Sequence, residues 1–259
     1  MKTKVFSLLL LARFAIPCAA QEISIAAASD LHNALGEIAA HFQSEKKVQV
    51  KISYGSSGNF FQQIQSGAPF DLFFSANTDY PSRLEASGLV APDSYLEYAR
   101  GKIVLMVSST SRLDLAHGMS VLLDPAVKKI AIADPSHAPY GQAAVAALKS
   151  KNLYDKVSGK IVMGENISQA ASFVISGAAD IGIVAMSLAI SPSAANQVKY
   201  SEIPNNSYPP IQQACVILRS SKQQKLAREF ENFIQQSDSK NIFRKYGFEV
   251  PEHGGKPLH

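Results

Sequence analysis

The order of apolar and polar positions divides the chain into short strands and amphipathic helices. Residues 23–27 form an apolar run and residues 48–54 alternate, as strands do, whereas residues 31–45 show the three- and four-residue spacing of a helix. Further strands are predicted at residues 71–76, 102–108, 129–133, 161–163, 180–185 and 213–218. Further helices are predicted at residues 59–66, 80–86, 141–148, 168–176, 222–236 and 239–246. Because strand and helix alternate, the pattern predicts parallel strands covered by helices on both faces.

These elements fall into two blocks of similar plan. We predict an α/β fold of two lobes, each a mainly parallel sheet flanked by helices. Residues 21–100 and 211–250 form the first lobe, and residues 101–210 form the second. The chain crosses between the lobes near Arg100 and again near Ile211, which predicts a hinge of two strands. Since ligands of open α/β sheets bind beyond the carboxyl ends of the strands, the cleft between the lobes is the expected binding place.

The first 20 residues have the pattern of a signal peptide. They begin with Lys2 and Lys4, continue with an apolar stretch too short to span a membrane, and end in the small residues Cys18-Ala19-Ala20. Cleavage near Ala20 would lower the net charge from +4 to close to neutral, because the segment holds three basic residues and no acidic one. A nearly neutral mature protein gives no reason to expect nucleic acid or an acidic membrane surface as partner.

Cysteine and histidine add little chemistry. Only Cys215 would remain after processing, and it lies in an apolar run, so we expect a buried thiol and no intramolecular disulfide. The six histidines have no metal-ligand spacing, which argues against a zinc site. Residues 251–259 are expected to form a disordered tail.

Small polar residues occupy four turns at predicted strand ends and helix starts, two in each block. The turns are Ser29-Asp30, Ser56-Ser57-Gly58-Asn59, Pro139-Tyr140-Gly141 and Asn166-Ile167-Ser168. Each offers backbone N–H groups at a helix start, and none brings lysine or arginine. One such turn alone is ordinary helix capping. Four together favour a site for a fully ionised oxyanion, which needs only hydrogen-bond donors.

At this point the chain resembles a known family, the periplasmic molybdate-binding proteins of ABC uptake systems. The resemblance covers residues 22–250 and lies in several motifs. They are Ala26-Ala27-Ala28-Ser29, Tyr54-Gly55-Ser56-Ser57-Gly58, Gly67-Ala68-Pro69-Phe70-Asp71-Leu72-Phe73, Ser75-Ala76, Tyr98-Ala99-Arg100-Gly101, the loop from Asp134-Pro135 to Pro139-Tyr140-Gly141, Gly182-Ile183-Val184 and Phe243-Arg244-Lys245-Tyr246-Gly247-Phe248.

The resemblance implies a fold and a function. The fold is that of a type II periplasmic binding protein. The protein would be a monomer without catalytic activity or cofactor, exported to the periplasm. It would capture molybdate or tungstate between its lobes and deliver the ion to the membrane permease of an ABC transporter.

The resemblance also implies the residues that hold the ion. Ser29 and Ser57 would donate their hydroxyl and backbone N–H groups, and Tyr140 and Ile167 would donate backbone N–H groups from the second lobe. Molybdenum would thus be held as an oxyanion, through Ser29, Ser57 and Ile167. Some members carry a tyrosine just after Gly-Ile-Val, where this chain has Ala185. Ala185 is therefore a possible contact, and the Tyr140 hydroxyl is expected to replace the missing one.

Asp30 conflicts with an anion site, because a carboxylate repels an anion. At the first position of a helix it favours the dipole, so we expect it to point outward. Pointing inward, it could accept a proton from hydrogen phosphate, which would favour phosphate as the ligand. Another oxyanion such as sulfate or phosphate is the alternative to molybdate. A serine hydrolase is a distant alternative, because Gly55-Ser56-Ser57-Gly58 is one residue short of the Gly-x-Ser-x-Gly elbow and His137 is the nearest base.

Overall fold

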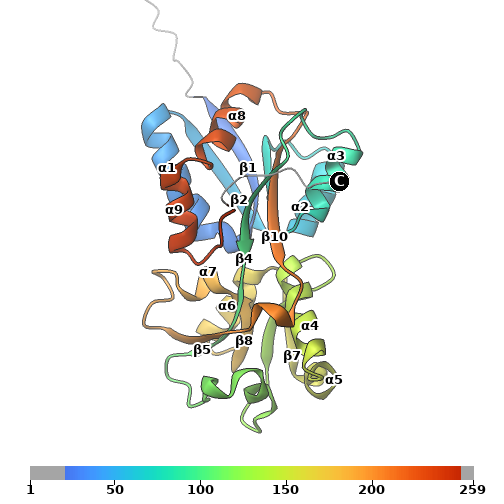
Figure 1. The fold of residues 1–259 in the computed structure, drawn as a ribbon, viewed down its shortest axis with the longest axis vertical. Coiled ribbons are helices and arrows are strands. Elements are labelled where there is room, and N and C mark those ends of the chain that lie inside the picture. Colours follow the sequence, from blue (N-terminus) through green and yellow to red (C-terminus); the bar gives the residue numbers. More distant parts are fainter. Residues whose placement is uncertain (1–20, 252–259) are drawn as a thin grey trace, which may run out of the picture.

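The computed structural model describes residues 21–251, which form two lobes stacked along the long axis of the molecule (Figure 1). The predicted signal peptide, residues 1–20, lies outside the described residues, as does the predicted tail beyond Pro251.

Each lobe contains one sheet of five strands. The first sheet has the order β2 (Gln49–Gly55), β1 (Glu22–Ala28), β3 (Leu72–Ser75), β10 (Ile211–Ile217) and β4 (Leu96–Gly101). The second has the order β7 (Ile161–Gly164), β6 (Ile130–Ala133), β8 (Ile181–Ala185), β5 (Ile103–Ser108) and β9 (Val198–Glu202).

Helices flank each sheet. In the first lobe they are η1 (Ser29–Leu31), α1 (His32–Lys46), α2 (Ser57–Gln65), α3 (Asp79–Ala86), α8 (Gln224–Phe233) and α9 (Ser237–Lys245). In the second they are η2 (Leu115–Leu123), α4 (Pro139–Ser150), α5 (Tyr154–Val157), η3 (Ser158–Lys160), α6 (Ile167–Ile175), α7 (Met186–Ala189) and η4 (Asn205–Ser207).

Both sheets are mixed in strand direction. Strand β1 is parallel to β2 and β3, whereas β10 is antiparallel to β3 and β4. The second sheet repeats this plan, with β6 parallel to β7 and β8, and β5 antiparallel to β8 and β9. The predicted two-lobe α/β fold is confirmed, and the antiparallel pairs arise where the chain passes through the hinge.

Two strands had no counterpart in the predicted pattern, β4 and β9. Both lie at a sheet edge, where polar side chains face solvent and break the apolar pattern. Strand β4 includes Glu97 and Arg100, and β9 is exposed or half-exposed along its length.

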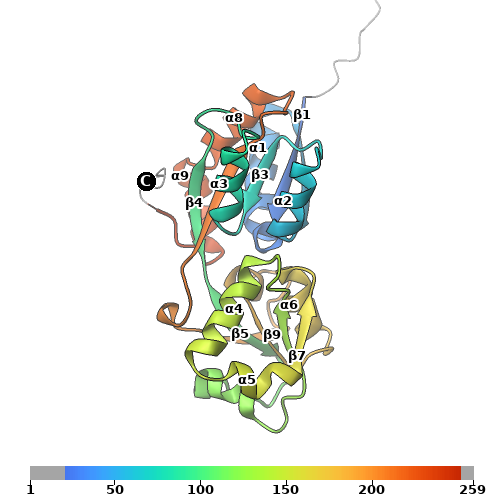
Figure 2. The same cartoon turned by 90° about the vertical axis from the view of Figure 1, so that its right-hand side faces the viewer.

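The first sheet buries its two faces in separate cores, as the alternation of strand side chains requires. Ile23, Ile25 and Ala27 of β1 belong to the core that also holds the apolar residues of α1, α8 and α9. Ala26 faces the other way, into the core with α2 and α3. Figures 1 and 2 show α1 and α9 on one side of the sheet and α2 and α3 on the other.

Two chain segments cross between the lobes, from β4 into β5 and from β9 into β10. The C-terminal segment pairs with the first of these. The Arg100 amide donates to the Glu249 carbonyl at 2.7 Å, and the Glu249 amide donates back at 3.0 Å. Lys102 Nζ also lies 3.1 Å from Glu249 Oε1. The segment around Glu249 is thus fastened to the hinge.

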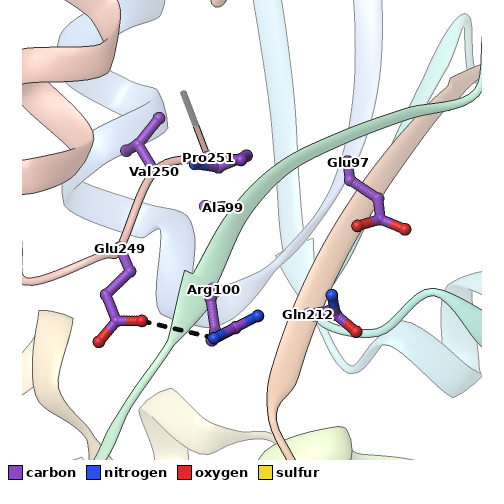
Figure 3. Close-up of a pocket in the computed structure, with 7 residues that line it drawn as sticks. All are labelled: Glu97, Ala99, Arg100, Gln212, Glu249, Val250 and Pro251. Atoms are coloured by element: carbon purple, nitrogen blue, oxygen red, sulfur yellow. Dashed lines mark ion pairs between the residues drawn. The ribbon is translucent and has the colours of Figure 1, made fainter. Parts of the chain in front are cut away.

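A hollow lies beside the hinge strands β4 and β10 and the segment that follows α9 (Figure 3). Its lining residues are Glu97, Ala99, Arg100, Gln212, Glu249, Val250 and Pro251. The Arg100 guanidinium is 3.8 Å from the Glu249 carboxylate, and Glu97 adds a second carboxylate. Because its one cation is already paired and its acids outnumber it, the hollow is poorly suited to an anion.

Candidate functional site

A small pocket lies between the lobes. Both lobes contribute to its wall, which consists of Ala28, Ser29, Asp30, Gly55, Ser56, Ser57, Ala76, Ala138, Pro139, Tyr140 and Ile167. It lies beyond the carboxyl ends of β1, β2, β3 and β6, where an open α/β sheet places its ligand. Its lining contains no lysine or arginine.

The first lobe contributes the starts of two helical segments. Ser29 follows β1 directly and opens η1, and Ser57 opens α2. The first backbone N–H groups of a helix have no partner within the helix. Ser57 Oγ accepts a hydrogen bond from the Ala76 amide at 2.9 Å, so its own proton is free to donate. Both serines are buried.

The second lobe contributes the starts of α4 and α6. Pro139 occupies the first turn of α4, where its missing N–H costs nothing, and Tyr140 follows it. Asn166 caps α6 by accepting the Gln169 amide at 3.0 Å, which leaves the Ile167 amide at the first position. The structure therefore brings Ser29, Ser57, Tyr140 and Ile167 to one cavity.

Hydrogen bonds across the junction hold the lobes together around the cavity. Ser29 Oγ donates to Asn166 Oδ1 at 3.2 Å and accepts from the Ser168 amide at 3.3 Å. Ser56 Oγ donates to the His137 carbonyl at 2.7 Å, and the Gly58 amide donates to the same carbonyl at 2.9 Å. These contacts define a closed arrangement of the two lobes.

Gly58 allows the two lobes to approach each other closely at His137. A Cβ at Gly58 would lie 2.6 Å from the His137 carbonyl oxygen and 2.7 Å from the Tyr80 hydroxyl. Because such distances are far below van der Waals contact, any larger residue would separate the lobes at this point.

Asp30 points inward, so the prediction of an outward carboxylate is wrong. Its side chain is completely buried and lines the cavity. Oδ2 accepts hydrogen bonds from the Tyr140 hydroxyl at 2.9 Å and from Gln213 Nε2 at 2.7 Å. Oδ1 is buried and has no hydrogen-bond partner among residues 21–251. Two donors from other elements thus turn the side chain into the cleft.

Burial raises the pKa of Asp30 from 3.8 to about 6. The hydrogen bonds from Gln213, from Tyr140 and from the backbone of Asp30 itself act in the opposite direction, because they stabilise the carboxylate, but they offset only part of the desolvation. A carboxyl with this pKa changes its protonation near neutral pH.

The Tyr140 hydroxyl donates to Asp30 and accepts from Gln213 Nε2 at 3.1 Å. In this arrangement its proton is directed to Asp30, while its backbone N–H stands in the first turn of α4. Gly101 makes room for this group, because a Cβ there would collide with the Tyr140 hydroxyl. Gln213 had no signal in the sequence except that a polar residue interrupts a buried strand.

Ala185 ends β8 and is fully buried, but it is not part of the cavity wall. Two residues later, Ser187 Oγ donates to the Asp30 carbonyl at 2.8 Å. The chain at this end of β8 therefore contacts η1 and does not line the cavity.

Ser56 and His137 form a contact that a hydrolase could use, with Oγ 2.7 Å from Nδ1. The Ser56 hydroxyl also points to the His137 carbonyl, and His137 Nε2 is 3.7 Å from Asp134 Oδ2, too far for a hydrogen bond. The pair therefore joins the lobes without forming a catalytic triad. Within residues 21–251 no group of three or more His, Cys, Asp or Glu could hold a metal ion.

A two-lobe fold that closes on a cavity lined by hydrogen-bond donors defines a binding protein for a small solute. Residues 23–249 match the profile of a family described as bacterial extracellular solute-binding protein. The chain is 34% identical over 242 residues to the Molybdate-binding protein ModA of Rhodobacter capsulatus, covering 93% of this chain and 94% of that protein. This chain belongs to the bacterial extracellular solute-binding proteins, and within them to the molybdate-binding protein ModA family.

Solved structures agree with this assignment. The Azotobacter vinelandii periplasmic molybdate-binding protein superposes with a TM-score of 0.84 at 33% identity, covering 89% of this chain and 100% of that chain. The sulfate-binding protein SubI of Mycobacterium tuberculosis H37Rv shares the fold, with a TM-score of 0.72 at 17% identity and coverage of 90% and 88%. The predicted family is confirmed, and its members are solute-binding proteins and not enzymes.

Among residues 21–251, no helix combines the length and the apolar character that a membrane crossing requires.

Proposed function

We propose that this chain binds molybdate or tungstate in the cavity between its lobes and delivers the ion to the membrane permease of an ABC transporter. The observation that carries the proposal is the convergence of four helix starts on a cavity whose lining holds two serine hydroxyls at helix starts and no cation. Family membership supports the choice of ion, since several relatives are named molybdate-binding proteins.

In this proposal Ser29 and Ser57 donate hydroxyl and backbone N–H groups, and Tyr140 and Ile167 donate backbone N–H groups. Hydrogen bonds to a charged acceptor contribute about 1.5–3 kcal/mol each, so several of them bind a dianion without a counter-charge. Ser29 exchanges its present bonds to Asn166 and Ser168 for the ion. Ala185 is left out of the proposed site, because it is not among the residues that line the cavity.

Closure of the lobes supplies the affinity. With the lobes apart, an ion in the cleft meets the donors of one lobe only, whereas the closed cavity adds the donors of the other. A ligand shifts a conformational equilibrium by its difference in affinity for the two states, so the ion favours closure. The permease would then recognise the closed form.

The proposed site residues would donate hydrogen bonds to any tetrahedral dianion, so the size of the ion is the main basis on which the site selects its ligand. Sulfate has the charge and shape of molybdate but shorter bonds, so it spans fewer donors in the same cavity. Phosphate stays the alternative that the inward Asp30 keeps open, because an ionised carboxylate can accept the proton of hydrogen phosphate. Family membership removes the hydrolase alternative.

The remaining assignments belong to the same proposal. Residues 1–20 form a signal peptide removed near Ala20, and the mature monomer acts in the periplasm. Residues 21–100 with 211–250 move as one body and residues 101–210 as the other.

A panel of ligands tests the function directly. Thermal unfolding of the mature protein is measured with molybdate, tungstate, sulfate, phosphate and a neutral sugar, since a ligand that binds only the folded state raises the melting temperature. We expect large rises with molybdate and tungstate. A rise with phosphate of the same size as that with molybdate would contradict the proposed ion, and no rise with any anion would contradict oxyanion binding.

A further inference from the structure

We propose that Asp30 takes up one proton when the lobes close on the anion, and that its neutral Oδ1–H group donates a hydrogen bond to the bound ion. The proposal rests on the proposed function, since it concerns the same cavity and the same class of ligand. It makes Asp30 a binding residue and makes affinity depend on pH.

The two oxygens of the carboxyl have different surroundings. Oδ2 already accepts two hydrogen bonds, from Tyr140 and Gln213, and so is the oxygen that stays unprotonated in the neutral acid. Oδ1 is buried, lacks a partner among residues 21–251, and belongs to a side chain in the cavity wall. A buried polar atom without a partner is costly, and an oxyanion in the cavity supplies an acceptor for a proton on Oδ1.

No cation compensates a negative charge at Asp30. The side chains that face its carboxyl are neutral donors, Tyr140 from α4 and Gln213 from β10. Tyr98 of β4 stands behind them, and its hydroxyl donates to Gln213 Oε1 at 2.7 Å. An ionised Asp30 would therefore meet a dianion across the cavity without any opposite charge between them.

The other elements packed on η1 do not change this balance. Neither α6 nor α7 carries a titratable side chain. Helix α1 and strand β2 bring His32 and Tyr54, whose rings face each other at 4.7 Å, and His32 is exposed to solvent. Lys51 of β2 is exposed and pairs with Glu22.

The direction of the linkage follows from these surroundings. Burial already raises the pKa of Asp30 to about 6, and a dianion nearby favours the neutral form further. Binding therefore raises the pKa of Asp30, the protein takes the proton from solvent onto Oδ1, and affinity falls as the pH rises. No other reactant takes part.

Calorimetric titration with molybdate tests the inference. Heats are measured in several buffers of different ionisation enthalpy between about pH 6 and pH 9, where molybdate itself is fully ionised, and their slope gives the protons taken up. We expect uptake to approach one proton per ion at neutral pH. We expect the affinity to fall about tenfold per pH unit above that.

Asp30→Asn supplies the matched variant, because its amide keeps an oxygen for Tyr140 and Gln213 and a donor in place of Oδ1–H. It should bind without proton uptake, with affinity independent of pH, and more tightly than the natural protein in alkaline buffer. Asp155→Asn, at an exposed position of α5 in the second lobe, should keep the proton uptake of the natural protein.

The outcomes separate this inference from the function on which it rests. Molybdate binding by the natural protein without proton uptake, or an Asp30→Asn variant that keeps the pH slope, would overturn the inference and leave the function standing. No binding of molybdate at any pH would overturn the function itself. The natural protein's proton count decides the question even when the variant fails to fold.

Discussion

The Tyr140 hydroxyl donates to Asp30 Oδ2 at 2.9 Å, and this hydrogen bond joins the start of a helix in the second lobe to a carboxyl of the first. Both groups are buried at the cavity, and Gln213 donates to each of them. The sequence interpretation assigned the tyrosine to the ion and turned the aspartate away from it. If Asp30 is protonated on binding as proposed, the two residues together couple the closure of the lobes to the charge state of the Asp30 carboxyl, while the Tyr140 backbone N–H stays a proposed donor to the ion.

Tyr140→Phe removes this hydrogen bond and keeps the ring. We expect molybdate affinity to fall by about 1 kcal/mol, or roughly fivefold, because the closed state loses one hydrogen bond between the lobes. Loss of a donor to the carboxylate should also raise the pKa of Asp30, which moves the fall in affinity to higher pH. Titration calorimetry across pH measures both effects.

The control for that variant is Tyr54→Phe, which removes a hydroxyl whose bond to the His32 carbonyl stays within the first lobe. It should leave both affinity and pH profile unchanged. An unaltered pH profile in Tyr140→Phe would contradict the coupling between Tyr140 and Asp30.

The largest expected change in molybdate affinity comes from removing the hydroxyls of Ser29 and Ser57. Ser29→Ala combined with Ser57→Ala removes two hydroxyl donors to a dianion, each contributing about 1.5–3 kcal/mol, so affinity should fall by about a hundredfold or more. Ser87→Ala with Ser176→Ala, two exposed serines near helix ends, is the matched control. Equal calorimetric affinities for the two double variants would remove Ser29 and Ser57 from the site.

Gly58→Ala tests whether molybdate binding requires the lobes to close completely. Gly58→Ala places a Cβ against the His137 carbonyl of the other lobe, so the folded lobes should remain but close less completely. Because apparent affinity falls with the fraction of closing-competent protein, we expect a loss of about tenfold or more. Small-angle scattering with saturating molybdate should show a more extended particle than the natural protein.

Gly159→Ala is the control for this variant, since a Cβ at Gly159 meets no atom within 4 Å. A Gly58→Ala protein that binds and compacts like the control would show that the lobes close without this contact.

The features that could be predicted from the sequence are those that depend only on neighbouring residues in the chain. Ser29, Ser57, Tyr140 and Ile167 each begin a helical segment or lie in its first turn, and small polar residues after an apolar run reveal such positions. The meeting of the two turns within each lobe also follows, since parallel strands of one sheet place their carboxyl ends together, and the two chain crossings predict that the lobes face each other.

Asp30 and Gln213 could not be predicted, because their roles depend on contacts between elements far apart in the chain. The local rule that an acid favours a helix start says nothing of Tyr140, which lies more than a hundred residues away. Gln213 opens the strand predicted at residues 213–218, and nothing in the local pattern shows that its side chain is buried. Burial and hydrogen bonding between lobes reversed the expected direction of the carboxylate.

Glu231 is a second buried carboxyl with a raised pKa, and it lies in the core of the first lobe rather than at the cavity. Its Oε2 is 2.6 Å from Arg228 Nη1, while Oε1 has no partner within residues 21–251. Burial raises the pKa of Glu231 from 4.5 to about 7, against the opposing effect of Arg228. Its titration therefore changes stability over the same pH range in which Asp30 changes binding.

Glu231→Gln separates the two effects. A carboxyl whose pKa is higher in the folded state stabilises the fold fully below its unfolded pKa, and that contribution is lost as the pH rises through about 7. The variant, neutral at every pH, should therefore match the natural protein near pH 4, below the unfolded pKa, and exceed its unfolding free energy by about 1–3 kcal/mol near pH 8. Urea unfolding at both pH values measures this, with Glu229→Gln on the same helix as control.

Because Glu231 lies away from the cavity, its variant should keep the full pH dependence of molybdate affinity. A flattened binding profile in Glu231→Gln would mean that the dependence assigned to Asp30 belongs to the fold as a whole.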